Sequence, residues 1–209
     1  MSVRDKTARS SSNRRRRELL DACTRARAAK RTAKAIGLYR SLLEITPEDS
    51  TSRAHLAQLL VKKKQDAQAA REFQTAIAGY EKTGRESQAL ATALTYTKLL
   101  PADADGWLIA VRLHEAHERT GDVLDLLIDA RFALFHANQY EGALRVLQVL
   151  RTYPASVFAV RADIVHCLVR LQRFGEAQEM LLSLEDSVTT PGRRKLYRHL
   201  RRKIRRRAS

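Results

Sequence analysis

Tyr-Glu-Gly-Ala-Leu-Arg-Val-Leu, at residues 140–147, recurs further along the chain as Phe-Gly-Glu-Ala-Gln-Glu-Met-Leu at residues 174–181. The same interval separates Ala35 from Ala69, each followed by apolar residues at helical spacing. This interval, about 34 residues, is the period of a solenoid unit made of two helices and a turn. The sequence therefore predicts a helical repeat array, an architecture typical of proteins that bind other molecules.

Composition and spacing agree with an all-α chain. Apolar residues make up 44% of the 209 residues, and only eight Gly and four Pro are available for turns. Apolar residues recur three and four apart, and no alternation typical of a strand competes with them. Pro, Gly and Asp then set the boundaries of eleven predicted helices. We place them near residues 14–30, 32–46, 50–63, 66–82, 86–100, 104–119, 122–137, 140–152, 156–171, 174–186 and 193–206.

The predicted units resemble tetratricopeptide repeats. The residues that carry the resemblance include Ala35, Ile36, Tyr39, Leu42, Leu43 and Pro47, then Leu56, Ala57, Leu60, Ala69, Phe73 and Ala76, and the units that end in residues 140–154 and 174–184. The resemblance extends over most of residues 16–191. It implies a right-handed α-solenoid of antiparallel helix pairs, with about five units and a concave surface that binds a protein or peptide.

Two features depart from a regular repeat. Pro101 follows the fifth predicted helix, and the interval from Ala69 to Ala143 is longer than two regular periods. We expect either helix 66–82 or helix 122–137 to serve as the second helix of one unit and the first helix of the next.

The predicted binding surface follows from the stacking of helix pairs. In such a stack, the first helix of each unit lines the inner surface. Four polar residues of helices 50–63 and 156–171 would face a partner there: Gln58, Lys62, His166 and Arg170.

The net charge of +16 is concentrated at the two ends of the chain. Residues 1–34 carry +9 and residues 192–209 carry +10, whereas residues 35–191 carry −3. We expect three regions: a disordered basic tail at residues 1–13, the repeat domain at 14–191, and a basic amphipathic helix and tail at 192–209. The candidate contacts to a polyanion are Arg14, Arg15, Arg16, Arg17, Arg193, Arg194, Lys195, Arg198, Arg201, Arg202, Lys203, Arg205, Arg206 and Arg207.

An apolar stripe divides the basic C-terminal helix. Leu196, Leu200 and Ile204 are spaced four apart, and basic residues surround them. We expect this stripe to seal the last repeat as a capping helix. The remaining charge suits an acidic partner, which could be nucleic acid, an anionic membrane surface or an acidic protein segment.

No pattern for catalysis, a metal or a cofactor is present in the sequence. His114 and His117 are three residues apart, whereas a zinc protease helix places its two histidines four apart, so we expect a solvated helix face. His166 and Cys167 are neighbours on one predicted helix, and neighbouring helical side chains point away from each other. We therefore predict a chain that is not an enzyme and uses no cofactor.

The remaining expectations concern location and role. Two distant cysteines, no apolar leader and no run of 18 apolar residues indicate a cytoplasmic protein without a transmembrane segment, and Arg-rich usage hints at a bacterial source. The leading hypothesis is an adaptor or scaffold that binds a protein or peptide partner. The alternative is a nucleic-acid or ribonucleoprotein-associated protein that acts through its basic ends. The sequence leaves the oligomeric state open.

Overall fold

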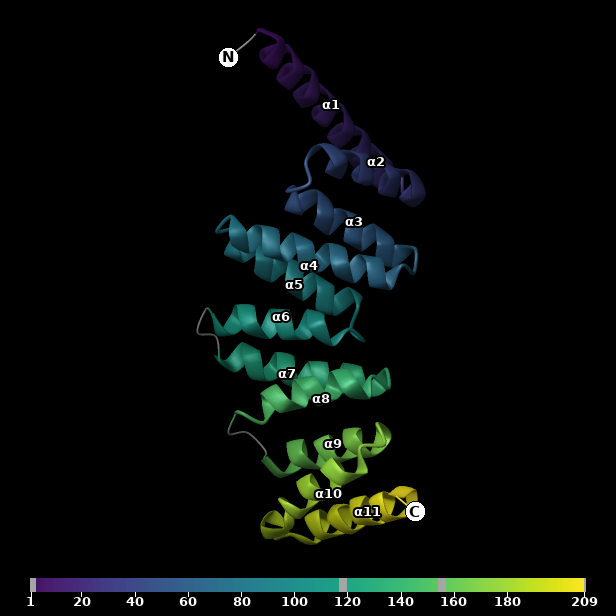
Figure 1. Ribbon diagram of the computed structural model, residues 1–209, viewed down its shortest axis with the longest axis vertical. Helices are drawn as coiled ribbons and strands as arrows, with labels where there is room; N and C mark the ends of the chain where they lie inside the picture. Colours follow the sequence, from purple (N-terminus) through teal and green to yellow (C-terminus); the bar gives the residue numbers. More distant parts are fainter. Residues whose placement is uncertain (1–2, 117–119, 154–156, 209) are drawn as a thin grey trace. The chain divides into compact units, whose positions relative to one another are not determined.

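The structure, a computed structural model, describes residues 3–116, 120–153 and 157–208. All regular structure in these residues is helical, with a short 3-10 helix at Glu185–Ser187 and no strand (Figure 1). The α-helices are α1 (Val3–Ala28), α2 (Thr32–Ile45), α3 (Ser50–Lys62), α4 (Asp66–Lys82), α5 (Glu86–Leu99), α6 (Ala104–Glu115), α7 (Thr120–His136), α8 (Tyr140–Leu150), α9 (Val157–Arg170), α10 (Phe174–Leu182) and α11 (Pro191–Ala208).

The chain forms two compact units. Met1–Leu100 contains α1 to α5, and Pro101–Ser209 contains α6 to α11. Within each unit, every helix packs against the next one along the chain, and the short turns make neighbours antiparallel. The predicted fold class, an all-α solenoid of antiparallel helix pairs, is confirmed.

The turns inside the helix pairs repeat one backbone conformation. Lys30, Lys64, Asn138 and Gln172 have φ between 54° and 60°. Lys30 and Lys64 are one repeat period apart in the sequence, and so are Asn138 and Gln172. The amide after each of them donates to a carbonyl five residues earlier, as from Gln65 N to Leu60 O at 3.0 Å. This hydrogen bond and a left-handed residue define the Schellman ending of a helix. The sequence period is thus a period of turn geometry as well.

A second kind of connection contains proline. Pro47 and Pro101 each follow the last turn of a helix, and Asp49 and Asp103 then cap the next helix by accepting hydrogen bonds from backbone amides. By contrast, Gly84 joins α4 to α5 with the left-handed turn found inside pairs. Helix α4 therefore has this turn on both sides, which agrees with the expectation that helix 66–82 belongs to two successive pairs.

Small residues permit close packing within the pairs. Ala35, Ala69, Ala143 and Ala177 are all fully buried, in α2, α4, α8 and α10. The absence of larger side chains lets each of these helices approach its partner, while neighbouring Leu, Ile and Phe residues fill the spaces between turns.

The described residues begin and end in helices. Helix α1 begins at Val3, so residues predicted as a disordered basic tail belong to the first helix. Neither Gly nor Pro occurs in residues 3–28, so no residue breaks the helix ahead of its predicted start. At the other end, α11 packs on α9 and α10.

Candidate partner-binding surfaces

A groove in the first unit contains two of the predicted binding residues. Gln58 and Lys62, on α3, line a cavity of about 620 Å³ together with residues from the end of α1 and from the turn that follows it. We call this cavity the α1/α3 groove. Its remaining lining residues are Thr24, Arg27, Ala28, Lys30, Thr32, His55 and Leu59.

The charged side chains that line the α1/α3 groove all have the same sign. Its charged lining residues are Arg27, Lys30 and Lys62, all cationic, and no carboxylate of the described residues lines it. The Thr32 hydroxyl and the Gln58 amide add further hydrogen-bond donors, whereas the Thr24 hydroxyl already donates to the Leu20 carbonyl over 3.0 Å. The groove therefore suits a ligand that presents carboxylates or backbone carbonyls.

Arg27, Tyr39 and His55 connect the groove to the core. The Arg27 guanidinium donates to the Tyr39 hydroxyl over 3.3 Å, and the Tyr39 and His55 rings lie 6.0 Å apart. Burial lowers the pKa of His55, and the nearby charge of Arg27 lowers it further, while Asp49 acts in the opposite direction. His55 is therefore neutral at pH 7, and the positive charge of the groove comes from Arg27 and the two lysines.

His166 and Arg170, the other two predicted binding residues, meet on Tyr140. The His166 ring stacks on the Tyr140 ring with centroids 6.0 Å apart, and the Arg170 guanidinium lies 4.7 Å from the centre of the same ring. The Phe135 ring contacts both His166 and Tyr140. Burial lowers the pKa of His166, and the charges of Lys203, Arg170 and His199 act in the same direction. Arg170 is exposed, so it is the member of this cluster that a partner can reach.

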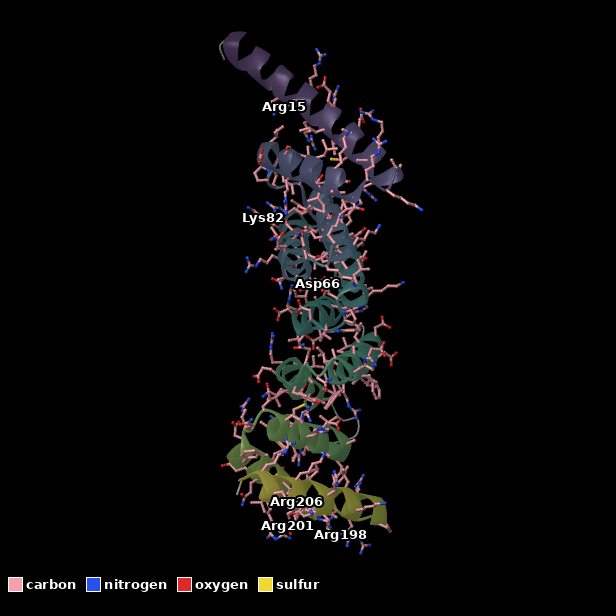
Figure 2. The ribbon with its side chains drawn as sticks, turned by 90° about the vertical axis from the view of Figure 1, so that its right-hand side faces the viewer. Arg15, Asp66, Lys82, Arg198, Arg201 and Arg206 are labelled. Carbon is pink, nitrogen blue, oxygen red and sulfur yellow. The ribbon has the colours of Figure 1, made fainter. Side chains whose placement is uncertain are left out.

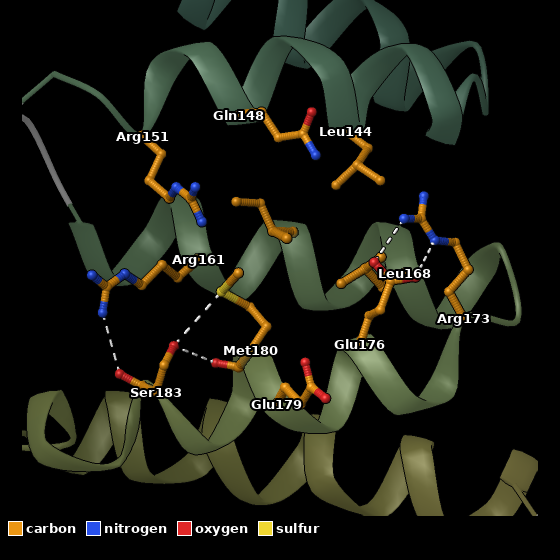
Figure 3. A pocket seen from close by; sticks show the side chains of 11 residues that line it. Leu144, Gln148, Arg151, Arg161, Leu168, Arg173, Glu176, Glu179, Met180 and Ser183 are labelled. Carbon is orange, nitrogen blue, oxygen red and sulfur yellow. Dashed lines mark hydrogen bonds and ion pairs between the residues drawn. The ribbon is translucent and has the colours of Figure 1, made fainter.

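A second cavity, also of about 620 Å³, lies in the second unit between α8 and α10, with α9 at its base (Figure 3). Apolar residues such as Leu144, Leu168 and Met180 line it. The Arg173 guanidinium forms two hydrogen bonds of 2.7 Å with Glu176, so its charge is compensated locally. This cavity presents mixed charge, unlike the α1/α3 groove.

The C-terminal helix has the orientation that its apolar stripe predicted. Leu200 and Ile204 are only 3% and 5% exposed, whereas Leu196, nearer the start of the helix, is 40% exposed. The predicted capping role of α11 is thus supported by the packing of two of the three stripe residues. Arg198 and Arg201 project from the outer side of α11 (Figure 2).

The other predicted basic residues differ in their surroundings. Arg193 is held against the protein, because its guanidinium lies 4.9 Å from the Phe158 ring and donates to the Ser187 carbonyl over 3.0 Å. Lys203 is half-buried. The remaining basic residues of the prediction are exposed: Arg14, Arg15, Arg16, Arg17, Arg194, Lys195, Arg198, Arg201, Arg202, Arg205, Arg206 and Arg207.

The structure corrects one expectation about the histidines of α6. His114 is buried, and its Nδ1 lies 3.6 Å from the Asp122 carboxylate of α7, whereas a solvated face was predicted. The reason is that α6 packs on both α7 and α8, which covers more than one of its faces. His117 lies outside the described residues. No group of three or more potential metal ligands occurs among the residues that the structure describes.

Cys167 is a core residue. Its side chain is fully buried, and burial raises the pKa of its thiol to about 12, with nearby Asp163 adding to the effect. A thiol with such a pKa stays protonated at neutral pH and is a poor nucleophile. His166, its neighbour in sequence, packs on the aromatic cluster as described above. In the described part of the chain, no helix is long and apolar enough to cross a membrane.

Several residues that contribute to these surfaces were not predicted as binding residues from the sequence. Arg27 and His55 belong to separate helices and meet only because α1 and α3 flank the same groove. Tyr140 was used only to recognise the repeat, although Arg170 and His166 both pack on it. A usable signal existed for Arg27, since it occupies the last turn of a predicted first helix.

Comparison with known proteins supports the repeat. Residues 26–94 match a family model described as tetratricopeptide repeat. The matched segment includes Ala35 and Ala69 and extends from the end of α1 into α5. The match covers about a third of the chain. The recognition of tetratricopeptide-like helical repeats is confirmed. No curated protein matches the chain closely enough to be a relative.

Solved structures resemble the chain weakly. The tetratricopeptide domain of P58(IPK) shows 14% identity and a TM-score of 0.35 over 99% of this chain and 63% of its own length. The pilF protein of Pseudomonas aeruginosa shows 12% identity and a TM-score of 0.31 over 90% and 99%. A tetratricopeptide repeat protein from Parabacteroides merdae shows 12% identity and a TM-score of 0.30 over 91% and 86%.

Proposed function

We propose that this tetratricopeptide-like chain is a non-catalytic adaptor that binds an acidic segment of a protein partner in the α1/α3 groove. The observation that carries the proposal is the lining of that groove, where the charged residues Arg27, Lys30 and Lys62 are all cationic. Tetratricopeptide repeats generally mediate interactions between proteins, and the matched residues 26–94 include the α3 side of the groove.

The dimensions of the groove support a peptide ligand. A volume of about 620 Å³ falls within the range of about 300–1,000 Å³ typical of ligand sites. Leu59 and Ala28 offer apolar contact, while Gln58 and the two threonines can bond to a peptide backbone. Because Arg27 is held by Tyr39, part of the positive charge is fixed in place before a partner arrives, which lowers the entropic cost of binding.

The exposed Arg170 of α9 is proposed as a further contact to a protein partner, with His166 and Tyr140 fixing its position. A guanidinium that rests on an aromatic ring keeps its edge available for a carboxylate. This contact is secondary, because Arg170 lines neither of the two cavities described above.

The test uses arrays of immobilised peptides with acidic, neutral and basic composition, probed with the intact chain. We expect retention on acidic peptides, and the Lys62→Glu variant should bind them about tenfold more weakly, since one favourable charge contact is replaced by a repulsive one. Lys63→Glu is the matched control, because Lys63 is exposed and lies outside the groove lining.

Two results would contradict the proposal. One is equal retention on acidic, neutral and basic peptides. The other is an equal loss of binding in Lys62→Glu and Lys63→Glu, which would show that only the total charge of the protein matters.

A further inference from the structure

The outer side of α11 carries a dense field of positive charge. No acidic residue occurs in Pro191–Ala208, and eight of its Lys and Arg residues are exposed, apart from Arg193, which is held against Phe158. We call these eight residues the α11 basic face: Arg194, Lys195, Arg198, Arg201, Arg202, Arg205, Arg206 and Arg207. Capping the last repeat requires an apolar stripe and a polar outer side, but it does not require eight exposed cations without a single acidic residue.

The apolar side of α11 is already occupied. Leu200 and Ile204 are buried against the unit, and Tyr197 is half-buried. A helix that inserts into a bilayer surface needs its apolar side free to enter the acyl region. The partner of α11 therefore meets a helix held in place by the protein, with most of the basic face directed outward. Arg201 and Arg205 also line a cavity beside α10 that contains Glu185, and Arg207 lies toward the side of the apolar stripe.

The basic face is wide around the helix axis. At 100° per residue, Arg194 and Arg201 lie on one flank, and Lys195 and Arg206 lie on the other, about 100° to 140° away, with Arg198 between the flanks. A single acidic peptide strand would contact one line along such a helix. Contacts on both flanks require a partner with negative charge on two sides of the helix.

Duplex DNA provides that arrangement in its major groove. The groove is about 12 Å wide and admits an α-helix, whose diameter is about 10–12 Å, between two phosphate backbones. From Arg194 to Arg207 the helix extends about 20 Å, and a duplex carries one negative charge per about 1.7 Å, so roughly 12 phosphates lie beside the eight exposed cations. Seven of the eight are arginines, whose planar guanidinium groups match phosphate oxygens.

We propose that α11 is a duplex-DNA-binding helix that lies in the major groove and contacts phosphates on both of its walls. Phosphate contacts carry the affinity, so binding tolerates changes in base sequence. This inference concerns a different surface from the α1/α3 groove and goes beyond the adaptor function. Either proposal can fail without the other.

The experiment measures binding of the intact chain to a fluorescein-labelled DNA duplex of arbitrary sequence by anisotropy, as a function of salt. With six or more phosphate contacts, affinity should fall by about 10³-fold between about 50 and 200 mM salt. The variant with Arg194→Gln, Arg201→Gln and Arg206→Gln, which changes residues on both flanks, should lower the slope of log K against log salt by about 2.7, since each contact contributes about 0.9. These side chains are exposed, so thermal unfolding followed by circular dichroism should be unchanged.

The matched control removes three charges elsewhere. Lys63→Gln, Arg71→Gln and Lys98→Gln together change exposed cations that lie outside α11 and outside the predicted polyanion contacts, and they should leave the slope unchanged. An equal loss in both triple variants would overturn the proposal, because net charge would then explain the binding. Competition by polyglutamate at equal charge concentration, or equal or tighter binding of single-stranded DNA or duplex RNA, would overturn it as well. Preference for duplex DNA with loss only in the α11 variant would support it.

Discussion

The substitution Gly142→Ala tests how closely α8 approaches α6. A Cβ atom added at Gly142 would lie 2.9 Å from the Cβ of Ala104 and 3.3 Å from a Leu134 methyl. The Ala104 Cβ is attached directly to the backbone of α6, so no side-chain rotation can relieve the contact. The helices must move apart, and overpacking of this kind costs about 1–3 kcal/mol.

Helix propensity acts in the opposite direction. Alanine is favoured over glycine within a helix by about 1 kcal/mol, and by less in the first turn, where Gly142 lies. We therefore expect Gly142→Ala to destabilise the second unit by about 1 kcal/mol. The matched control is Gly175→Ala in the first turn of α10, where an added Cβ meets nothing within 4 Å. That variant should stabilise the unit by about 0.5 kcal/mol.

The assay is urea unfolding followed by the fluorescence of Trp107. This residue is the only tryptophan of the chain and lies on α6, one turn from Ala104, so its emission reports on the second unit. In the double variant with Ala104→Gly the contact is relieved, and Gly142→Ala should then cost at least about 1 kcal/mol less than it does alone. If Gly142→Ala stabilises the protein as Gly175→Ala does, the close approach of α8 and α6 is refuted.

Three further predictions concern burial and titration. Leu200→Ala should destabilise the second unit by about 2–4 kcal/mol and Leu196→Ala by less than about 1 kcal/mol, measured by the same unfolding assay, because only Leu200 is fully covered. Folding lowers the pKa of His55, so the unfolded chain binds the proton more readily than the folded chain does. The contribution of His55 to the free energy of unfolding should therefore be present above about pH 6.5 and be lost as the pH falls below that value. In urea titrations at several pH values His55→Gln should flatten this dependence, and an unchanged profile would contradict the prediction. Cys167, with a pKa of about 12, should react with iodoacetamide at pH 8 only after unfolding in urea, and rapid labelling of the native protein, located by peptide mass spectrometry, would contradict its burial.

The helix pattern was predictable because its signals are local. The predicted helix 66–82 coincides with α4, and the predicted helices 50–63 and 86–100 each end one residue beyond α3 and α5. Pro47 and Pro101 end helices through their own geometry, and the Asp residues that follow them cap the next helix. Such effects operate over a few residues and are visible in one sequence.

The left-handed turns were less visible. Glycine is the usual residue at such a position, and Gly84 was recognised as a turn for that reason. Lys30, Lys64 and Gln172 have the same left-handed conformation although they are not glycine, and their residue types do not predict it. Packing of the flanking helices fixes the geometry and outweighs a local cost of about 1–2 kcal/mol at each residue.

Burial and binding surfaces depend on contacts between distant segments. His114 has polar neighbours in sequence, yet contacts from α7 and α8 cover it. Gln58 and Lys62 were placed in a groove by the repeat alone, whereas Arg27 enters the same groove from a helix that begins at Val3, well before its predicted start. The period therefore predicts which face of a helix is available but not which residues from another helix share it.

The two proposed surfaces are both cationic, so weakening of binding by salt alone cannot distinguish them. Their shapes differ: Arg27, Lys30 and Lys62 line a cavity with hydroxyl and amide groups beside them, whereas the α11 basic face is convex and presents eight cations around one helix. A cavity limits the size of its ligand and can bond to a peptide backbone, and a convex helix requires a ligand that surrounds it. For this reason the decisive comparison in both experiments is between variants of equal charge change inside and outside the surface, which holds net charge constant and varies only position.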